Sequence, residues 1–265
     1  MNILLKSTKA KKGDVFMNTI TLGSRYDIVT SHAQVKGSKH RRNQQTCEDV
    51  VLIRATNDYL FCGLADGQSD TKYGVDGGRK CLEAIFDYIG STGSDNLLNT
   101  PFPDELPCAF VKSYRKELLP LAESNSTSIN EFASTLLAIA VDLRNGKYIL
   151  LHLGDGCVIS IPRTGDPIPI SAPENGITSY HTWLTTSDSA VSHFRVTFGS
   201  FANKRRLLLM SDGATCFCRG REIPWRAKDL LKESSHSEIY DRLIQSNPVD
   251  DATCIILDIC KSIHA

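Results

Sequence analysis

The chain has 265 residues, of which 41% are hydrophobic, and its 30 basic side chains are balanced by 30 acidic ones. A net charge of zero argues against a nucleic-acid-binding protein held by bulk electrostatics, because such proteins usually carry a basic excess. The longest unbroken apolar run, residues 136–141, is far shorter than the roughly 18 residues that a bilayer span needs. The composition therefore favours a globular protein that does not cross a membrane.

Cysteine usage and the N-terminal stretch bear on the compartment. The nine cysteines are scattered from Cys47 to Cys260 and form no C-x-x-C pair, so neither a disulfide scaffold nor a zinc site is indicated. The opening MNILLKSTKAKKGD has its apolar residues before its lysines, the reverse of a secretory signal. We therefore expect a cytoplasmic protein with a poorly ordered leader over residues 1–18 and a single domain over residues 19–265.

Short apolar runs alternate along the chain with segments whose apolar residues recur at helical spacing. In chain order we expect strands at 50–54 and 59–64, then a helix at 78–89 and a second helix that starts between Asp104 and Pro107. Three strands follow, at 135–143, 147–153 and 157–161, and then a loop or edge at 162–175. The last expected elements are a strand at 206–210, helices at 225–233 and 238–245, and a strand at 252–259. Asn145-Gly146 fits a type I′ hairpin turn. The pattern indicates an α+β sandwich built on antiparallel sheets.

Carboxylates stand at the ends of five of these strands. Three apolar runs end in Asp66-Gly67, Asp155-Gly156 and Asp212-Gly213, while Glu48-Asp49 and Asp250-Asp251 each precede a strand. Carboxylates gathered at one edge repel one another unless cations lie among them, and all-oxygen ligation selects magnesium, manganese or calcium. The alternative is that each Asp-Gly is only a hairpin turn. That alternative is strongest at Asp155, which has a strand on both sides.

The order of these motifs resembles the metal-dependent protein phosphatases of the protein phosphatase 2C (PPM) type, from about Gly37 to Asp258. The resemblance is closest to the compact bacterial branch, because Gly37-Ser38-Lys39-His40 precedes Cys47-Glu48-Asp49. It implies a four-layer α+β sandwich, in which two packed antiparallel sheets are flanked by helices. It also implies hydrolysis of phosphoserine and phosphothreonine in proteins by a metal-activated water, with two Mn²⁺ or Mg²⁺ ions and a third, weaker site.

The resemblance also assigns roles to individual residues. Asp66 would bridge the two metal ions, with the Gly67 carbonyl on one of them, and Asp212 and Asp250 would bind the second ion. These three aspartates would be the catalytic carboxylates. Three further acidic residues would complete the site: Glu48 beside the second ion, Asp49 on a metal-bound water, and Asp155 at the third ion.

Two positions depart from the family pattern. Gln44 stands where many relatives have a phosphate-binding arginine, and Arg41 or Arg42 could take its place because a guanidinium fits phosphate oxygens. The alternative is that residues 39–42 are only an exposed basic loop. Gln68 stands where some relatives have a histidine that protonates the leaving group.

The remaining candidates are weaker. Cys47 and His152 are expected to be packing residues, whereas His181 and His193 flank a segment that resembles a family surface flap. Two other functions stay open: a phosphatase of a small phosphorylated metabolite, and a catalytically silent module that binds a partner. The expected partners are phosphorylated proteins, with no nucleic acid and no membrane. The residues do not indicate an oligomeric state.

Overall fold

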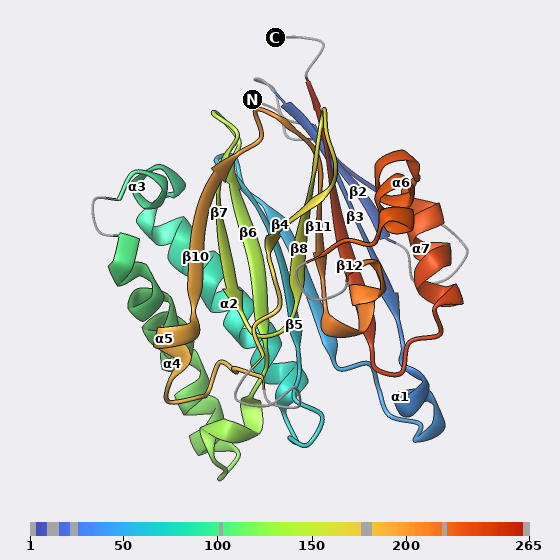
Figure 1. The fold of residues 1–265 in the computed structure, drawn as a ribbon. Helices are drawn as coiled ribbons and strands as arrows, with labels where there is room; N and C mark the ends of the chain where they lie inside the picture. The colour runs from blue at the N-terminus through green and yellow to red at the C-terminus, as the bar shows by residue number, and fades with distance from the viewer. Residues whose placement is uncertain are drawn as a thin grey trace.

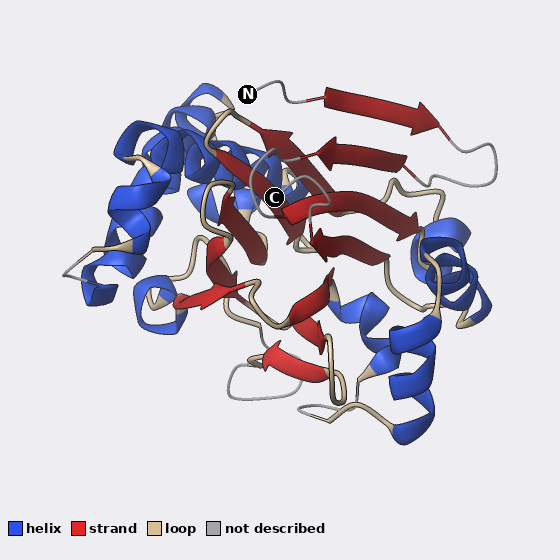
Figure 2. Ribbon diagram, turned by 90° about the horizontal axis from the view of Figure 1, so that it is seen from above, coloured by secondary structure: helices blue, strands red, loops and turns tan. Residues whose placement is uncertain are grey.

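The computed structural model describes residues 4–9, 16–21, 26–100, 103–175, 182–218 and 222–261. Two antiparallel sheets pack face to face, and helices cover the outer face of each (Figures 1 and 2). The expected four-layer α+β sandwich is therefore confirmed. Among the described helices, none combines the length and the apolarity that a bilayer span requires.

The two sheets differ in size. The larger sheet has seven strands, in the spatial order β1 (Leu4–Lys9), β2 (Phe16–Thr21), β3 (Tyr26–Val35), β12 (Ala252–Lys261), β11 (Lys204–Met210), β8 (Cys157–Pro162) and β9 (Ile168–Ser171). The smaller sheet has five, in the order β10 (Arg195–Ser200), β7 (Lys147–Leu153), β6 (Leu136–Asp142), β5 (Tyr59–Asp66) and β4 (Asp49–Ala55). The helices are α1 (Ser38–Arg42), α2 (Gly74–Thr92), α3 (Ser94–Leu98), α4 (Leu106–Ser124), α5 (Ala190–His193), α6 (Trp225–Glu233) and α7 (His236–Gln245).

Alternating side chains on the strands build a separate core at each layer boundary. In β5, Leu60 and Leu64 face the opposite sheet, whereas Phe61 and Ala65 face helices α2 and α4. This alternation is the period of two that a strand imposes on its side chains. Because β5 is buried on both faces, its run is almost continuously apolar. A third core lies between the outer face of the larger sheet and helices α6 and α7.

The helices form where the sequence places an apolar stripe. The expected stripe of α4 is confirmed, since Phe110, Val111, Tyr114 and Leu118 are all buried against the smaller sheet. On the other side of the molecule, α7 begins with a capping box in which Ser235 and Glu238 satisfy each other's backbone N–H groups. Helix α4 thus packs on the outer side of the smaller sheet and α7 on the outer side of the larger sheet (Figure 2).

The turn between β6 and β7 differs from the expected type I′ turn. The Asp142 carboxylate accepts hydrogen bonds from the backbone N–H groups of Arg144 (2.8 Å) and Asn145 (3.3 Å). Gly146 has a positive φ of 69°, but Asn145 does not, whereas a type I′ turn requires both. The aspartate therefore organises a longer loop that the Asn-Gly pair alone does not specify.

The N-terminal stretch contains two described strands. Residues 4–9 and 16–21 form β1 and β2, and β2 pairs with β3 in antiparallel register. A leader was expected over residues 1–18. Because β2 pairs with β3, β3 has a neighbouring strand on both sides and is not at the edge of the sheet. The division into a leader and a domain that starts at residue 19 stays a prediction.

Candidate metal centre

The ends of strands from both sheets meet at one edge of the sandwich. Asp49 and Asp66 lie directly opposite each other at the ends of β4 and β5. Asp212 begins the 3₁₀ helix that follows β11, and Asp250 precedes β12. Asp66, Asp155, Asp212 and Asp250 line a common cavity of about 650 Å³.

None of the three Asp-Gly pairs is a hairpin turn. The chain passes through Asp155 from β7 in the smaller sheet to β8 in the larger one, so the strands on either side do not pair with each other. Asp66 is followed by helix α2, and Asp212 opens a 3₁₀ helix. The turn alternative is therefore wrong at all three positions, and the pairs instead mark where the chain leaves a sheet.

Backbone contacts fix the positions of these carboxylates. The Thr135 hydroxyl accepts a hydrogen bond from the Asp66 N–H (3.0 Å), and the Asp66 carbonyl accepts one from the Thr135 N–H (2.8 Å). A Cβ at Gly213 would clash with the Asp251 carbonyl, so only glycine allows the Asp212 segment to approach β12 this closely. The end of β5 and the start of β12 are thereby held beside the cavity.

Burial and neighbouring carboxylates raise the pKa of two aspartates that line the cavity. Burial raises the pKa of Asp66 well above its usual range, and the charges of Asp49, Asp212, Asp250 and Asp155 raise it further. Burial, with Asp155 and Asp250, raises the pKa of Asp212 to about 6. These carboxyl groups therefore resist being ionised together unless a cation lies among them.

Asp49 lies deeper than the others. Its side chain is 5% exposed, and the Ser211 hydroxyl donates a hydrogen bond to its Oδ2 (3.0 Å). Burial raises its pKa well above the usual range, and the charges of Asp251 and Asp212 add to this shift. Its Oδ1 is buried without a hydrogen-bond partner among the described residues. A buried acceptor of this kind is costly unless a cation, a water or a proton satisfies it.

The donors at this edge fit a hard divalent cation. They are carboxylate and carbonyl oxygens, and the described residues that line the cavity include no sulfur and no imidazole; oxygen ligands suit magnesium, manganese or calcium. Within the described ranges, no three acidic, histidine or cysteine side chains are already drawn together as a cage. A cation would therefore have to draw mutually repelling carboxylates together, and the sixfold or looser coordination of these ions tolerates that adjustment.

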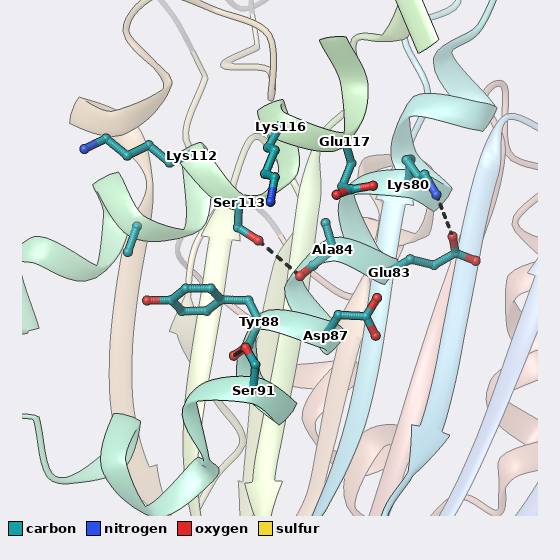
Figure 3. A pocket seen from close by; sticks show the side chains of 11 residues that line it. Lys80, Glu83, Ala84, Asp87, Tyr88, Ser91, Lys112, Ser113, Lys116 and Glu117 are labelled. Carbon is teal, nitrogen blue, oxygen red and sulfur yellow. Dashed lines mark hydrogen bonds and ion pairs between the residues drawn. The ribbon is translucent and has the colours of Figure 1, made fainter. Parts of the chain in front are cut away.

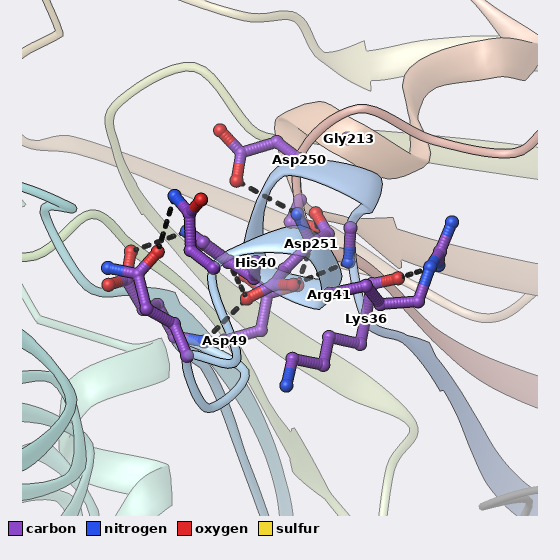
Figure 4. A network of polar contacts seen from close by, with 12 residues as sticks. Lys36, His40, Arg41, Asp49, Gly213, Asp250 and Asp251 are labelled. Carbon is purple, nitrogen blue, oxygen red and sulfur yellow. Dashed lines mark hydrogen bonds and ion pairs between the residues drawn. The ribbon is translucent and has the colours of Figure 1, made fainter.

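A buried network behind the cavity was not foreseen from the sequence. His40 is fully buried, and its Nδ1 lies 2.8 Å from Oδ2 of Asp251 (Figure 4). The same Oδ2 accepts a hydrogen bond from the Glu48 N–H (2.6 Å), and Oδ1 accepts one from the Gly37 N–H (2.7 Å). The Glu48 carboxylate turns toward His40 Nε2 (3.4 Å) and does not line the cavity. The second aspartate of the Asp250-Asp251 pair is thus a structural acceptor, a role that only its burial reveals.

Residues 39–42 are not simply a basic loop. They belong to helix α1, in which His40 is buried while Lys39, Arg41 and Arg42 are exposed. Neither arginine lines the cavity, whereas Lys39 does. The Arg41 guanidinium donates to the Lys36 carbonyl and to Asn247 Oδ1. Its role in phosphate binding stays a prediction, as does that of Arg42.

Among the described residues, no three cysteine, histidine or acidic side chains form a competing metal centre. Burial and the charges of Asp49 and Asp251 raise the pKa of Cys47, so its thiol is protonated at neutral pH and is a poor nucleophile. His152 is buried and hydrogen-bonded to Ser171 (2.6 Å), as a packing residue would be. His193 stacks on Trp183 and contacts Glu174 (2.8 Å). His181 lies outside the described residues.

A second cavity, of about 600 Å³, lies between helices α2 and α4, away from the carboxylate cluster (Figure 3). Its wall mixes three lysines with three acidic residues, and Lys80 pairs with Glu83 across one helical turn (3.9 Å). Ser113 donates to the Ala84 carbonyl (3.2 Å) and so ties the two helices together. This groove has neither a carboxylate cluster nor an activated nucleophile.

Comparison with solved structures supports the fold. RsbX in complex with magnesium is 13% identical, with a TM-score of 0.60 over 97% of this chain and 100% of that one. The catalytic domain of the serine/threonine phosphatase PstP with two manganese ions is 17% identical, with a TM-score of 0.63 over 88% and 99%. Stp1 from Staphylococcus aureus is 17% identical, with a TM-score of 0.64 over 87% and 94%. At these identities the likeness concerns the fold.

Sequence comparison identifies the family. No curated protein matches the chain. The family model described as Protein phosphatase 2C matches residues 36–254. This range contains helix α1 and every carboxylate of the cluster. This chain therefore belongs to the protein phosphatase 2C family.

Proposed function

We propose that this chain is a serine/threonine protein phosphatase whose carboxylate cluster holds two Mn²⁺ or Mg²⁺ ions. The observation that carries the proposal is that Asp66 and Asp212 lie in one cavity with Asp155 and Asp250, where these carboxylates repel one another. Divalent cations in such a site lower the pKa of water and polarise phosphoryl oxygens. The proposed ligands are Asp66, shared by the two ions, with the Gly67 carbonyl, Asp212 and Asp250.

The other residues of the edge would position these groups and the substrate. The buried Oδ1 of Asp49 would accept a hydrogen bond from an attacking or metal-associated water. Asp155 would hold a third cation, and the Thr182 hydroxyl that donates to its Oδ2 would orient it. Glu48 would act on the second ion only after it turns away from His40. Attack by water needs no covalent phospho-enzyme, which agrees with the protonated thiol of Cys47.

The substrate class is a proposal as well. The cavity is open at the edge of the sandwich and would admit a side chain that protrudes from another protein. The solved relatives include serine phosphatases, such as the one from Staphylococcus aureus. We propose that phosphorylated proteins are the substrates and that the enzyme works in the cytoplasm.

The test is a phosphatase assay with phosphoserine and phosphothreonine peptides beside small phosphomonoesters, each with Mn²⁺, with Mg²⁺ and with EDTA. Metal-dependent hydrolysis with higher kcat/KM on the peptides supports the proposal. Efficient turnover of small phosphomonoesters alone would make the chain a metabolite phosphatase. Hydrolysis that persists after exhaustive chelation would refute the metal mechanism.

A further inference from the structure

Among the described residues that line the metal-site cavity, Lys39 is the single basic one. The other charged side chains there are aspartates, including Asp66, Asp212 and Asp250. We propose that the Lys39 ammonium binds the phosphate of the substrate, in place of the arginine that Gln44 replaces. This inference deepens the proposed phosphatase function and rests on it.

Helix α1 holds Lys39 at the cavity through its backbone. The Ser38 N–H donates to the Pro248 carbonyl (2.9 Å) and the Lys39 N–H to the Val249 carbonyl (3.0 Å). Both acceptors belong to the segment that leads directly into Asp250. A Cβ at Gly37 would clash with the Asp250 backbone, so the start of α1 lies directly against this proposed ligand.

The buried His40 makes this placement rigid. Its ring lies between Asp251 (2.8 Å) and Glu48 (3.4 Å), with no exposed surface. Consecutive residues of a helix point in directions about 100° apart. With His40 anchored inward, Lys39 is directed toward the cavity, where its side chain is exposed. The backbone from which Lys39 extends is therefore fixed beside the cavity, while its four-carbon stem stays flexible.

The other two exposed basic residues of α1, Arg41 and Arg42, do not line the cavity. Arg41 is held by the Lys36 carbonyl and by Asn247 (Figure 4), and Arg42 is exposed without lining the cavity. The Lys39 ammonium makes no ion pair within the part of the chain that the structure describes. Among the described basic residues of α1, Lys39 therefore combines a place in the cavity wall with an ammonium that no carboxylate pairs.

The charges explain why a cation is needed at this point. A cavity lined by aspartates repels a phosphate group, and a lysine in its wall adds an attraction that comes from the chain itself. A lysine provides a positive charge and three donors without a fixed fork, which suits a phosphate held mainly by other groups. The lysine would thus contribute to binding the phosphate and would leave the water-activating groups unchanged.

The test compares Lys39→Ala with wild type at saturating Mn²⁺. We expect kcat/KM on a phosphopeptide to fall roughly tenfold to a hundredfold, the effect of losing one charge-assisted hydrogen bond, mainly through a higher KM. Calorimetric binding of inorganic phosphate to the Mn²⁺-loaded protein should weaken by a similar factor. Mn²⁺ affinity should stay within about twofold, because the ammonium is not a metal ligand.

Two variants serve as controls. Lys39→Arg keeps a cation in place and should retain most of the activity and phosphate affinity. Lys36→Ala removes the same charge just before α1, at a residue that does not line the cavity, and should behave as wild type.

Several outcomes overturn the inference. One is a Lys39→Ala protein that matches wild type in KM and in phosphate affinity. A second is a loss of Mn²⁺ affinity as large as the loss of phosphate affinity, which would indicate a structural role. A third is a loss with Arg42→Ala and none with Lys39→Ala. Wild-type protein that hydrolyses no phosphoester would instead refute the proposed function, and phosphate calorimetry would still decide the role of Lys39.

Discussion

Strands β11 and β12 carry charged residues at both ends, but the two ends are built differently. At one end, Arg206 lies opposite Asp258 and binds it through Nε (2.5 Å) and Nη2 (2.9 Å). His236 Nε2 also contacts Asp258 (2.8 Å). At the other end the strands run into Asp212 and Asp250, and the neighbouring charges are carboxylates.

The pKa shifts of the two ends have opposite directions. Burial alone would raise the pKa of Asp258, but hydrogen bonds and charge from Arg206 and His236 lower it well below its usual range. Burial and neighbouring carboxylates raise the pKa of Asp212 to about 6. The same strand pair therefore has one end where opposite charges are paired and one end where like charges gather. We propose that the first end serves stability and the second binds a cation.

The largest expected effect is at the carboxylate cluster. Asp66→Asn replaces the proposed shared ligand with a neutral amide, so kcat/KM at saturating Mn²⁺ should fall at least a hundredfold to a thousandfold, roughly 3–4 kcal/mol of transition-state stabilisation. Asp76→Asn is the matched control, because Asp76 also precedes a glycine but is exposed in the first turn of α2. Its activity should stay at the wild-type level. Near-full activity in a folded Asp66→Asn protein would refute the binuclear assignment.

Breaking the ion pair between Arg206 and Asp258, at the opposite end of β11 and β12, should affect stability instead. Asp258→Asn leaves the charge of Arg206, which is 5% exposed, without its partner, and losing one member of a buried pair costs about 3 kcal/mol or more. Urea unfolding should show this loss, while kcat per folded molecule stays unchanged. Asp166→Asn, which removes an exposed partner of Lys228 and Lys232, should change stability little. Equal losses of unfolding free energy in Asp258→Asn and Asp166→Asn would contradict the stabilising role of the Arg206–Asp258 pair.

The pH dependence of the metal-free protein should also separate the two ends. The folded state keeps a proton on Asp212 up to about pH 6, whereas an unfolded aspartate loses its proton near pH 4. Because the folded state binds more protons between these values, its stability falls as the pH rises from about 4 to 6. Asp212→Asn should flatten this decline in metal-free thermal melts. For Asp258, whose pKa is lowered, stability should instead be lost as the pH falls below about 4.

The smallest expected effect is that of the thiol beside the cluster. Cys47→Ala should leave metal-dependent activity within about threefold of wild type, since burial and acidic neighbours keep the thiol protonated. Steady-state assays before and after alkylation of the wild-type protein give the comparison. Complete inactivation of Cys47→Ala without loss of fold would indicate a nucleophilic cysteine.

Local patterns predicted much of the fold. The apolar run at 59–64 and the stripe of α4 predicted elements that the structure contains, because a strand buried on both faces reads as continuously apolar and a helix buried on one face reads as a stripe. Strand β10 was not predicted, since its residues are mostly half-buried or exposed and carry no clear alternation. The passage of the chain between sheets at Asp155 also has no local signal.

The candidate site was predictable only in part. The Asp-Gly pairs marked carboxylates that the structure brings to one cavity, because glycine permits the chain to turn where a strand ends. The burial of His40 could not be read from a basic segment, and neither could the structural role of Asp251. Both depend on contacts between residues more than 200 positions apart, which no local pattern encodes.

The measurement that tests the central claim most directly is metal binding to the carboxylate cluster in the absence of substrate. Calorimetry and thermal melting would measure it. Wild-type protein freed of metal should bind Mn²⁺ and gain about 2.7 kcal/mol of stability at a hundred times the dissociation constant, and EDTA should reverse the gain. Asp66→Asn should be at least as stable as wild type without metal, because one repelling charge is gone, and should gain little from Mn²⁺. Equal stabilisation of both proteins by Mn²⁺, or no binding to the wild type, would contradict the account.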